Sequence, residues 1–355
     1  MSKVIVGMSG GVDSAVAALL LKRAGHDVTG ITLRTWESEG EAENRCCEID
    51  DARAVCMEIG IPYYPWNACS TFREMVIDPF VKDYLEGRTP NPCVECNRYV
   101  KWGRMLRIAN ELSADYIATG HYAEVVKLPN GRYTVRQSAA GKKDQTYMLW
   151  KLTQEQLSRT LMPLASLNKE EVRQIASEAG LPVAKKHDSQ EICFVPDGHY
   201  SEFIAEEAGD QCPGEGNFVD EDGKILGRHK GITHYTVGQR RGLGIAAGYH
   251  IFVKEIRPER DEIVLGREDA LFAEEICCND LNFLSIPDPE AGEKITARVR
   301  IRYHHAGEEA ELSRLDDGTL RILFRNPVRA ATPGQSAVFY DADGCVIGGG
   351  KIMRS

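Results

Sequence analysis

The stretch KVIVGMSGGVDSAVAALLLKRAGHDVTGITLRTW, residues 3–36, decides the fold. It opens with the β-branched run at 4–6, breaks at Gly7, and continues with apolar residues at helical spacing over 12–20. A second apolar run, DVTGITL, follows at 27–33. Strand, glycine turn, helix and strand form a βαβ unit, and such a unit requires its two strands to be parallel.

The same alternation continues farther along the chain. DARAVCMEIGIPYYPW (51–66) predicts a helix that ends at Gly60 and a strand after it, and RMLRIANELSADYIATG (104–120) predicts another helix and strand. Strands that alternate with helices favour an α/β fold with a doubly wound parallel sheet, whose ligands bind at the carboxyl ends of the strands. Leu33, Gly120 and His121 are expected at such ends.

The chain is long enough for more than one hydrophobic core. It has 355 residues, 43% of them hydrophobic and 27% charged, which is typical of a folded protein with two or three domains. Beyond residue 205 glycines and short turns predominate, and from about residue 281 short strands are separated by the hairpin signals DDG and DADG. We predict an α/β domain at 1–205, a small β-rich middle domain at 206–275 and a C-terminal β-barrel at 276–355.

The charge distribution restricts the kind of partner. A formal net charge of −10 argues against a protein coated in positive potential, so a nucleic-acid partner requires a local basic surface. Residues 294–329 carry eight basic and five acidic residues. In ARVRIRYHH the strand alternation places Arg298, Arg300 and Arg302 on one face, which predicts a cationic wall on the barrel.

The start of the chain and its cysteines indicate the compartment. MSKVIVGMSGG contains no long apolar stretch, so neither a signal peptide nor a membrane span is predicted and the cytoplasm is expected. In a reducing compartment, the eleven cysteines are expected to be catalytic, metal-bound or buried rather than paired for structural reasons.

The turn SGGVDS, residues 9–14, predicts a phosphate site. Gly10 and Gly11 permit backbone N–H groups to converge at the N-terminus of the following helix, where the unpaired donors and the helix dipole attract anions. The Walker pattern G-x-x-x-x-G-K-[ST] is absent. The alternative is an ordinary βα turn capped by Asp13 or Ser14.

Three cysteines are candidates for catalysis or metal binding. TPNPCVECNRYVKWG (89–103) places Cys93 and Cys96 in a C-x-x-C pattern, which by itself fits half a zinc site, a redox pair, an iron–sulfur fragment or a catalytic thiol with a neighbour. Cys193 lies in DSQEICF between Ile192 and Phe194, and this local pattern is typical of a buried structural cysteine.

The motifs taken together resemble a known family. SGGVDS resembles the PP-loop of the ATP pyrophosphatases, in which the loop grips the pyrophosphate of ATP. With GRTPNPCVECNRYVKWG, ATGHYA, KDQTYML, DSQEICF and YTVGQRRGLG (235–244), the chain resembles the tRNA-uridine 2-sulfurtransferases, or tRNA 2-thiouridylases, over essentially its whole length.

The resemblance implies a reaction between ATP, tRNA and a sulfur donor. ATP would adenylate O2 of the wobble uridine, and sulfur would then displace AMP. The position of Cys193 would receive a persulfide from a sulfur-relay protein or a cysteine desulfurase, and the position of Cys96 would act as the nucleophilic partner. Turnover would end in a Cys96–Cys193 disulfide that a reductant must reopen, because sulfur transfer is a form of thiol–disulfide exchange.

The resemblance also implies roles for individual residues. Those expected to bind ATP are Gly7, Met8, Ser9, Gly10, Gly11, Val12, Asp13, Ser14, Leu33 and Gly120, with Mg²⁺ near Asp13. Those expected beside the target base are Asn91, Pro92 and Cys93. Those expected to contact tRNA are His121, Lys143, Asp144, Gln145, Arg302, Tyr303 and Gln335.

Cys93 departs from a frequent family pattern and leaves alternatives open. Many members have Asp at this position, whereas three cysteines at 93, 96 and 193 could instead hold a [4Fe–4S] cluster. A structural zinc site would need a second C-x-x-C pair. From other functional classes, a PP-loop amidating ligase acting on a small molecule and a nonenzymatic tRNA-binding module remain.

The pKa of the Cys96 thiol is expected to lie below the usual value of ~8.5 for a free cysteine. Arg98, Lys101 and a helix N-terminus beginning within NRYVKWG are the expected causes.

Overall fold

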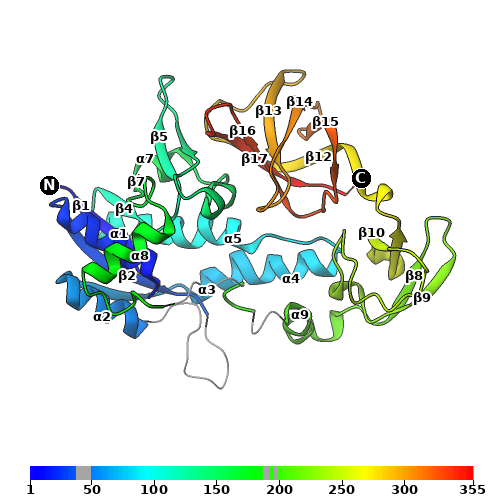
Figure 1. The fold of residues 1–355 in the computed structure, drawn as a ribbon, viewed down its shortest axis with the longest axis horizontal. Helices are drawn as coiled ribbons and strands as arrows, with labels where there is room; N and C mark the ends of the chain where they lie inside the picture. The colour runs from blue at the N-terminus through cyan, green and yellow to red at the C-terminus, as the bar shows by residue number, and fades with distance from the viewer. Residues whose placement is uncertain (37–48, 187–191, 196–198, 355) are drawn as a thin grey trace.

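The computed structural model describes residues 1–36, 49–186, 192–195 and 199–354. In chain order these residues form a five-stranded sheet, a four-stranded sheet and a closed six-stranded barrel, together with a two-stranded hairpin (Figure 1). The predicted doubly wound α/β class, β-rich middle domain and C-terminal barrel are therefore confirmed. The first four residues of the DSQEICF motif lie outside the described residues. No helix in the described ranges combines the length and apolar content required to cross a bilayer.

The five-stranded sheet is parallel throughout, in the order β3-β2-β1-β4-β7. Its strands are β1 (Lys3–Gly7), β2 (Asp27–Arg34), β3 (Tyr63–Asn67), β4 (Tyr116–Ala118) and β7 (Thr160–Leu161). The chain runs outward from β1 to β3 and then returns to the other side of β1 with β4. Strand order therefore reverses between β1 and β4, and a doubly wound sheet binds ligands at this switch point.

Helices cover both faces of the sheet because alternate residues of β1 point in opposite directions. Val4 and Val6 pack in the core beneath α1 (Val12–Arg23), α2 (Ile49–Ile59) and α8 (Lys169–Glu178). Ile5 packs in the core on the other face. That face is covered by α3 (Cys69–Phe72), the π-helical η1 (Arg73–Ile77), α4 (Asp78–Leu85), α5 (Pro92–Glu95), the π-helical η2 (Cys96–Trp102) and α6 (Gly103–Glu111).

One helix runs without a break from Pro92 to Glu111, because the residues at the α5–η2 and η2–α6 junctions have helical backbone angles. It begins after Asn91, whose backbone is extended (φ −114°, ψ 91°), and Pro92 occupies the first turn, where a missing N–H costs nothing. The expectation of a helix beginning within NRYVKWG is therefore wrong. Cys93 lies in the first turn, whereas Cys96 lies where the π-helical segment begins.

The α/β part contains four further elements besides short 3-10 turns. They are the hairpin strands β5 (Glu124–Lys127) and β6 (Tyr133–Arg136), the short helix α7 (Gln154–Ser158) and α9 (Tyr200–Ala208). The middle sheet has the order β10-β11-β8-β9. Its strands are β8 (Gly216–Val219), β9 (Ile225–His229), β10 (Phe252–Arg257) and β11 (Glu262–Gly266).

The barrel closes in the order β12-β15-β14-β13-β16-β17, which leaves no free sheet edge. Its strands are β12 (Phe272–Phe283), β13 (Lys294–Arg300), β14 (Glu308–Arg314), β15 (Leu320–Arg329), β16 (Ser336–Tyr340) and β17 (Val346–Ile352). The barrel rests on the α/β domain: the Trp150 indole donates a hydrogen bond to Ser336 Oγ at 3.0 Å, and Thr134 Oγ1 donates to the Val346 carbonyl at 2.6 Å.

Candidate active site

A cavity of about 300 Å³ opens at the carboxyl ends of β1, β2 and β4. It brings together three groups of predicted residues that are far apart in the sequence. The nucleotide loop contributes Gly7, Met8, Ser9, Asp13 and Ser14; the strand ends contribute Leu33, Gly120 and His121; the thiol segments contribute Pro92, Cys93, Cys96 and Cys193. Both cysteines to which the resemblance assigns sulfur transfer therefore line the same cavity as the nucleotide loop.

The nucleotide loop is shaped by its glycines and serines. Gly10 has φ +73°, a left-handed conformation that glycine adopts without strain. Ser14 Oγ donates to the Gly11 carbonyl at 3.1 Å and accepts from the Ser9 amide at 3.2 Å. Because the N-cap residue of α1 is Gly11, no capping side chain occupies the first-turn N–H groups, and they are available to an anion.

Two lysines that the sequence motifs did not single out also reach this loop. Lys169 Nζ lies 2.8 and 2.9 Å from the Asp13 carboxylate oxygens, and Tyr122 donates to the same carboxylate at 2.7 Å. Lys186 Nζ donates to the Gly10 carbonyl at 3.2 Å and pairs with Asp51 at 2.7 Å. Burial lowers the pKa of Lys186. These cations place positive charge where phosphate oxygens are expected.

Lys169 reaches the loop because of how α8 begins. Asn168 caps the helix and exchanges reciprocal hydrogen bonds with Glu171, which fixes the first turn. The sequence signals this capping box, but it contains no signal that α8 packs against α1. The sequence alone therefore could not predict that two lysines lie at the nucleotide loop.

Gly120 lies directly against the backbone of the nucleotide loop. A Cβ atom at this position would lie 2.6 Å from the carbonyl carbon of Asp13 and 2.7 Å from the backbone nitrogen of Ser14. The glycine is thus required by the backbone of the nucleotide loop itself, which packs directly against the end of β4.

His121 is held as a neutral imidazole. Burial, with the nearby Lys101 ammonium as a second cause, lowers the pKa of His121 well below its ordinary value of 6.5. Its Nδ1 lies 2.9 Å from Thr119 Oγ1, and its ring centroid lies 5.2 Å from that of Trp102. A neutral imidazole on the wall of this cavity can donate or accept a hydrogen bond to a base edge.

The two thiols differ in exposure. Cys96 is 9% exposed, whereas Cys193 is exposed. The local expectation that Cys193 is a buried structural cysteine is wrong, because the neighbouring Phe194 takes the buried position instead. Lys101 lines the cavity, but Arg98 is directed away from it and donates to the Lys151 carbonyl. Of the two cations expected to influence Cys96, only Lys101 faces the site.

Phe194 fixes the segment that carries Cys193. Its ring meets those of Phe72, Phe80 and Phe203 edge to face, with centroid separations of 5.5, 5.2 and 5.4 Å. Edge-to-face aromatic pairs contribute about 0.5–1.5 kcal/mol each beyond their burial. The exposed thiol is therefore attached to a well-anchored neighbour.

Comparisons with known proteins agree on one family. Residues 2–197 match the model described as the tRNA methyl transferase HUP domain, residues 201–267 the tRNA methyl transferase PRC-barrel domain, and residues 273–352 the aminomethyltransferase beta-barrel domain. The tRNA-specific 2-thiouridylase MnmA of Lachnoclostridium phytofermentans is 52% identical over 100% of both chains. The chain belongs to the tRNA-specific 2-thiouridylase family. The resemblance drawn from the motifs is thereby confirmed.

Other relatives of the 2-thiouridylase family are similarly close. The MnmA protein of Clostridium perfringens is 46% identical over 99% of this chain and 98% of its own length. Among solved structures, a 4-thiouridine synthetase in complex with RNA and ATP covers 59% of this chain and 51% of that chain, at 19% identity and a TM-score of 0.36.

Several residues for which the 2-thiouridylase resemblance implies tRNA contact lie at the junction between the α/β domain and the barrel. Asp144 is buried, accepts from Thr146 Oγ1 at 2.6 Å and lies 3.7 Å from Arg300. Burial raises the pKa of Asp144. Gln335 Nε2 donates to the carbonyls of Thr89 at 2.9 Å and Pro90 at 3.2 Å. Both side chains thus join domains in this structure, and their contact with tRNA stays a prediction.

The other residues predicted to contact tRNA differ in exposure. Lys143 and Arg302 are exposed, and Tyr303 is half-buried with its ring centroid 6.2 Å from that of Tyr147. Gln145 lines the cavity and accepts from the Tyr122 amide at 2.9 Å.

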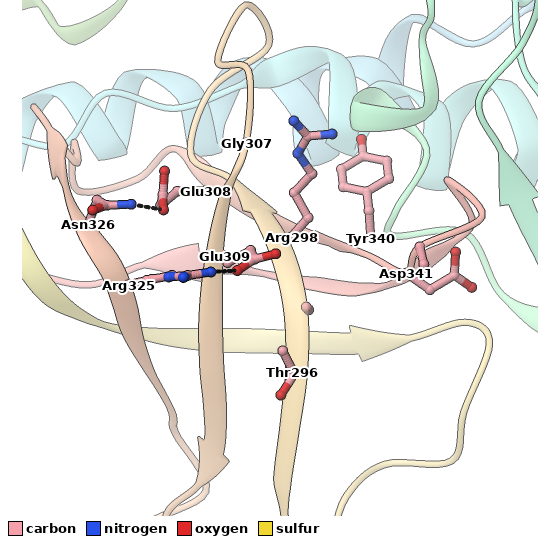
Figure 2. A pocket seen from close by; sticks show the side chains of 11 residues that line it. Thr296, Arg298, Gly307, Glu308, Glu309, Arg325, Asn326, Tyr340 and Asp341 are labelled. Carbon is pink, nitrogen blue, oxygen red and sulfur yellow. Dashed lines mark hydrogen bonds and ion pairs between the residues drawn. The ribbon is translucent and has the colours of Figure 1, made fainter.

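The barrel wall is less cationic than the sequence alternation predicted. Six of the eight basic side chains between 294 and 329 form ion pairs with carboxylates. A second cavity, of about 810 Å³, lies on this wall (Figure 2). In it Arg325 pairs with Glu309 and Asn326 donates to Glu308, each at 2.7 Å. Because these charges largely cancel, the lining does not select for phosphate.

The three cysteines do not form a preassembled metal site in this conformation. Across residues 1–36, 49–186, 192–195 and 199–354, no three His, Cys, Asp or Glu side chains converge closely enough to hold a metal ion. Cys93, Cys96 and Cys193 nevertheless share one cavity.

We expect Gly120→Ala to weaken ATP binding. The added methyl group would push against the backbone at Asp13 and Ser14, and overpacking of this kind costs about 1–3 kcal/mol. Titration calorimetry with ATP would measure the change, expected to be roughly tenfold. Gly103→Ala is the control, because its Cβ would meet the Arg98 carbonyl at an ordinary 3.4 Å. Equal affinities in the two variants would contradict the close-approach argument.

We expect His121 to make folding less favourable in mild acid. Below pH 6.5 the unfolded chain binds a proton at His121 that the folded chain does not. The free energy of unfolding is therefore not affected by this residue above pH 6.5, and it decreases as the pH falls below that value. Urea midpoints measured from pH 7.5 to 5.5 should fall less steeply for His121→Gln than for the wild type. The exposed His304→Gln should follow the wild type. Parallel curves for all three proteins would refute the assignment.

Proposed function

We propose that this protein catalyses ATP-dependent 2-thiolation of the wobble uridine of tRNA. The observation that carries the proposal is the single cavity lined by the nucleotide loop, Cys96 and Cys193. Family membership supports it, because the relatives at 46–52% identity are named tRNA-specific 2-thiouridylases. The anticodon base would enter as an unstacked nucleotide, which suits recognition of a single-stranded loop.

ATP would bind with its phosphates at the N-terminus of α1. The amides of the loop, with Ser9 and Ser14, would hold phosphate oxygens, and Lys169 and Lys186, which contact the loop, would add positive charge. Leu33 would contact the adenosine. Asp13, a carboxylate of the kind that Mg²⁺ prefers, would exchange its contact with Lys169 for the metal, which neutralises phosphate charge.

The thiols would carry out the sulfur transfer. Exposed Cys193 would accept a sulfur atom from a donor protein as a persulfide, whose terminal sulfur attacks C2 of the adenylated uridine and expels AMP. The less exposed Cys96 thiolate would then attack the Cys193 sulfur, releasing 2-thiouridine and leaving a Cys96–Cys193 disulfide. An external dithiol reductant would restore both thiols. The difference in exposure between Cys193 and Cys96 suits this division of roles.

The proposal includes partners and a compartment. A sulfur-relay protein or a cysteine desulfurase must reach Cys193, and the cytoplasm supplies both tRNA and reductant. Asn91, Pro92 and Cys93 would lie beside the target base, since they begin the helix that leads to Cys96.

A direct assay separates this proposal from functions of other classes. Unmodified tRNA, ATP and a persulfide donor are incubated with the protein, and the nucleosides are analysed by mass spectrometry. Appearance of 2-thiouridine together with AMP supports the proposal. Dependence on ammonia or glutamine without any effect of RNA would indicate an amidating ligase, and tRNA binding without ATP turnover would indicate a binding module.

We expect Cys96→Ser and Cys193→Ser each to abolish thiolation while tRNA affinity stays within about twofold of the wild type, because a hydroxyl group cannot replace the thiolate. Nucleoside analysis and filter binding would measure the two quantities. Cys56→Ser, at a buried position outside the cavity, is the control that should retain activity. Retained thiolation in either of the first two variants would overturn the assignment of the thiols.

Cys93→Asp decides between the persulfide route and the alternative [4Fe–4S] cluster. Under the persulfide route, this variant keeps its activity without iron, because Cys93 carries no sulfur in that scheme. Anaerobic purification with iron and sulfide analysis of both proteins provides the measurement. Stoichiometric iron in the wild type, together with loss of both iron and activity in the variant, would favour the cluster.

A further inference from the structure

A cluster of four charges, of which Glu95 and Lys151 are buried, joins the helix that carries Cys96 to the barrel. Lys151 Nζ lies 2.9 and 3.0 Å from the two carboxylate oxygens of Glu95 and 2.6 Å from Asp280 Oδ2. Lys351 Nζ lies 2.9 Å from Glu95 Oε1 and 3.5 Å from Asp280 Oδ2. Glu95 belongs to α5, whereas Asp280 and Lys351 belong to the barrel strands β12 and β17.

The cluster is balanced and well satisfied. Two carboxylates face two ammonium groups, and the three donors of Lys151 are matched by three carboxylate oxygens. The side chains of Lys151 and Glu95 are 7% and 11% exposed, whereas those of Lys351 and Asp280 are 29% and 43% exposed. The buried charges of Lys151 and Glu95 are tolerated because each has an oppositely charged partner, and loss of the Asp280 charge leaves two ammonium groups sharing the single carboxylate of Glu95.

Glu95 points away from the cavity that its neighbours line. Cys93 and Cys96 lie three residues apart on a helix and share one face, which borders the cavity. Glu95 lies on the other side of the same turn, where it meets the barrel. A contact that holds the Glu95 carboxylate therefore also holds the helical turn that carries Cys96.

Further hydrogen bonds place the barrel around the same segment. Gln335 binds the carbonyls of Thr89 and Pro90, just before the helix. Asn282 Nδ2 donates to the carbonyls of Trp150 at 2.7 Å and Leu152 at 3.0 Å, on either side of Lys151. The barrel thus holds both the start of the helix and the lysine that pairs with Glu95.

We propose that Glu95 and Asp280 are positioning residues for the thiol chemistry, and that the barrel, through this cluster, sets the placement of Cys96 in the cavity. The proposal rests on the proposed function for its catalytic consequence. Asp280 is the informative residue because it lies in the barrel, outside the cavity, and its effect on Cys96 passes through Lys151 and Glu95.

Asp280→Asn removes the charge with little disturbance of the backbone. Asp280 has φ +49°, a conformation that Asn also adopts readily. We expect kcat for tRNA thiolation to fall about tenfold while KM for tRNA stays within about twofold, because misplacement of a reacting group mainly affects the chemical step. The matched control is Glu275→Gln, which removes from the same strand a carboxylate of similar exposure that pairs with Arg321 on β15 and not with buried Lys151.

Thiol alkylation followed by peptide mapping tests the position of Cys96 independently of RNA. We expect iodoacetamide to modify Cys96 severalfold faster in Asp280→Asn than in the wild type, since the turn loosens and the local charge becomes more positive. Cys56 and Cys278, both fully buried, report on the two domain cores and should stay protected. The double variant Asp280→Asn/Lys351→Met restores charge balance, because one carboxylate (Glu95) then faces one ammonium group (Lys151). It should recover most of the activity.

The outcomes separate this proposal from its alternatives. Wild-type Cys96 reactivity and kcat in Asp280→Asn, or equal effects of Glu275→Gln, would overturn it. Faster alkylation of Cys56 or Cys278 together with Cys96 would also overturn it, because the cluster would then serve global stability. If the wild type forms no 2-thiouridine, the proposed function fails, whereas the alkylation rates still decide whether the barrel positions Cys96.

Discussion

The parallel pairing of β1 with β4 is the constraint on which the site depends. These strands are adjacent in the sheet although Val4 pairs with Tyr116, more than a hundred residues later. Because parallel strands end at the same edge, the loop after β1 and the turn after β4 are forced together. Gly120 permits the contact, since any side chain there would collide with the backbone of Asp13 and Ser14. The nucleotide loop, His121 and the cavity all follow from this approach.

The two thiols reach that edge by different routes. Cys96 is carried by a continuous helix whose start and charged flank are held by the barrel, and it is nearly buried. Cys193 follows a segment anchored by Phe194 in an aromatic cluster, and it remains exposed. One thiol is therefore fixed within the fold and the other is presented at its surface, as a reaction with an incoming sulfur donor would require.

In this acidic protein, most of the basic side chains at the nucleotide loop and on the barrel wall pair with nearby carboxylates. Lysines at the nucleotide loop hold carboxylates that phosphate groups can replace, while most basic side chains on the barrel wall are already neutralised by acidic neighbours. The contribution of the barrel is consequently as much structural as electrostatic. Asp144 with Arg300, and Gln335 with the Thr89 carbonyl, attach it to the α/β domain.

The sequence by itself determined the features that local spacing encodes. The strand at 3–7, the helix after SGGVDS and the short strands of the barrel all depend on neighbouring residues, so periodicity and turn chemistry were sufficient to predict them. The family motifs indicated that Cys96 and Cys193 carry the sulfur chemistry. Only the tertiary structure decided that Cys193 is exposed, that the helix of Cys96 begins at Pro92, that Lys169 and Lys186 reach the nucleotide loop, and that Asp280 pairs with Lys151. These facts arise from contacts between segments distant along the chain, which no local pattern records.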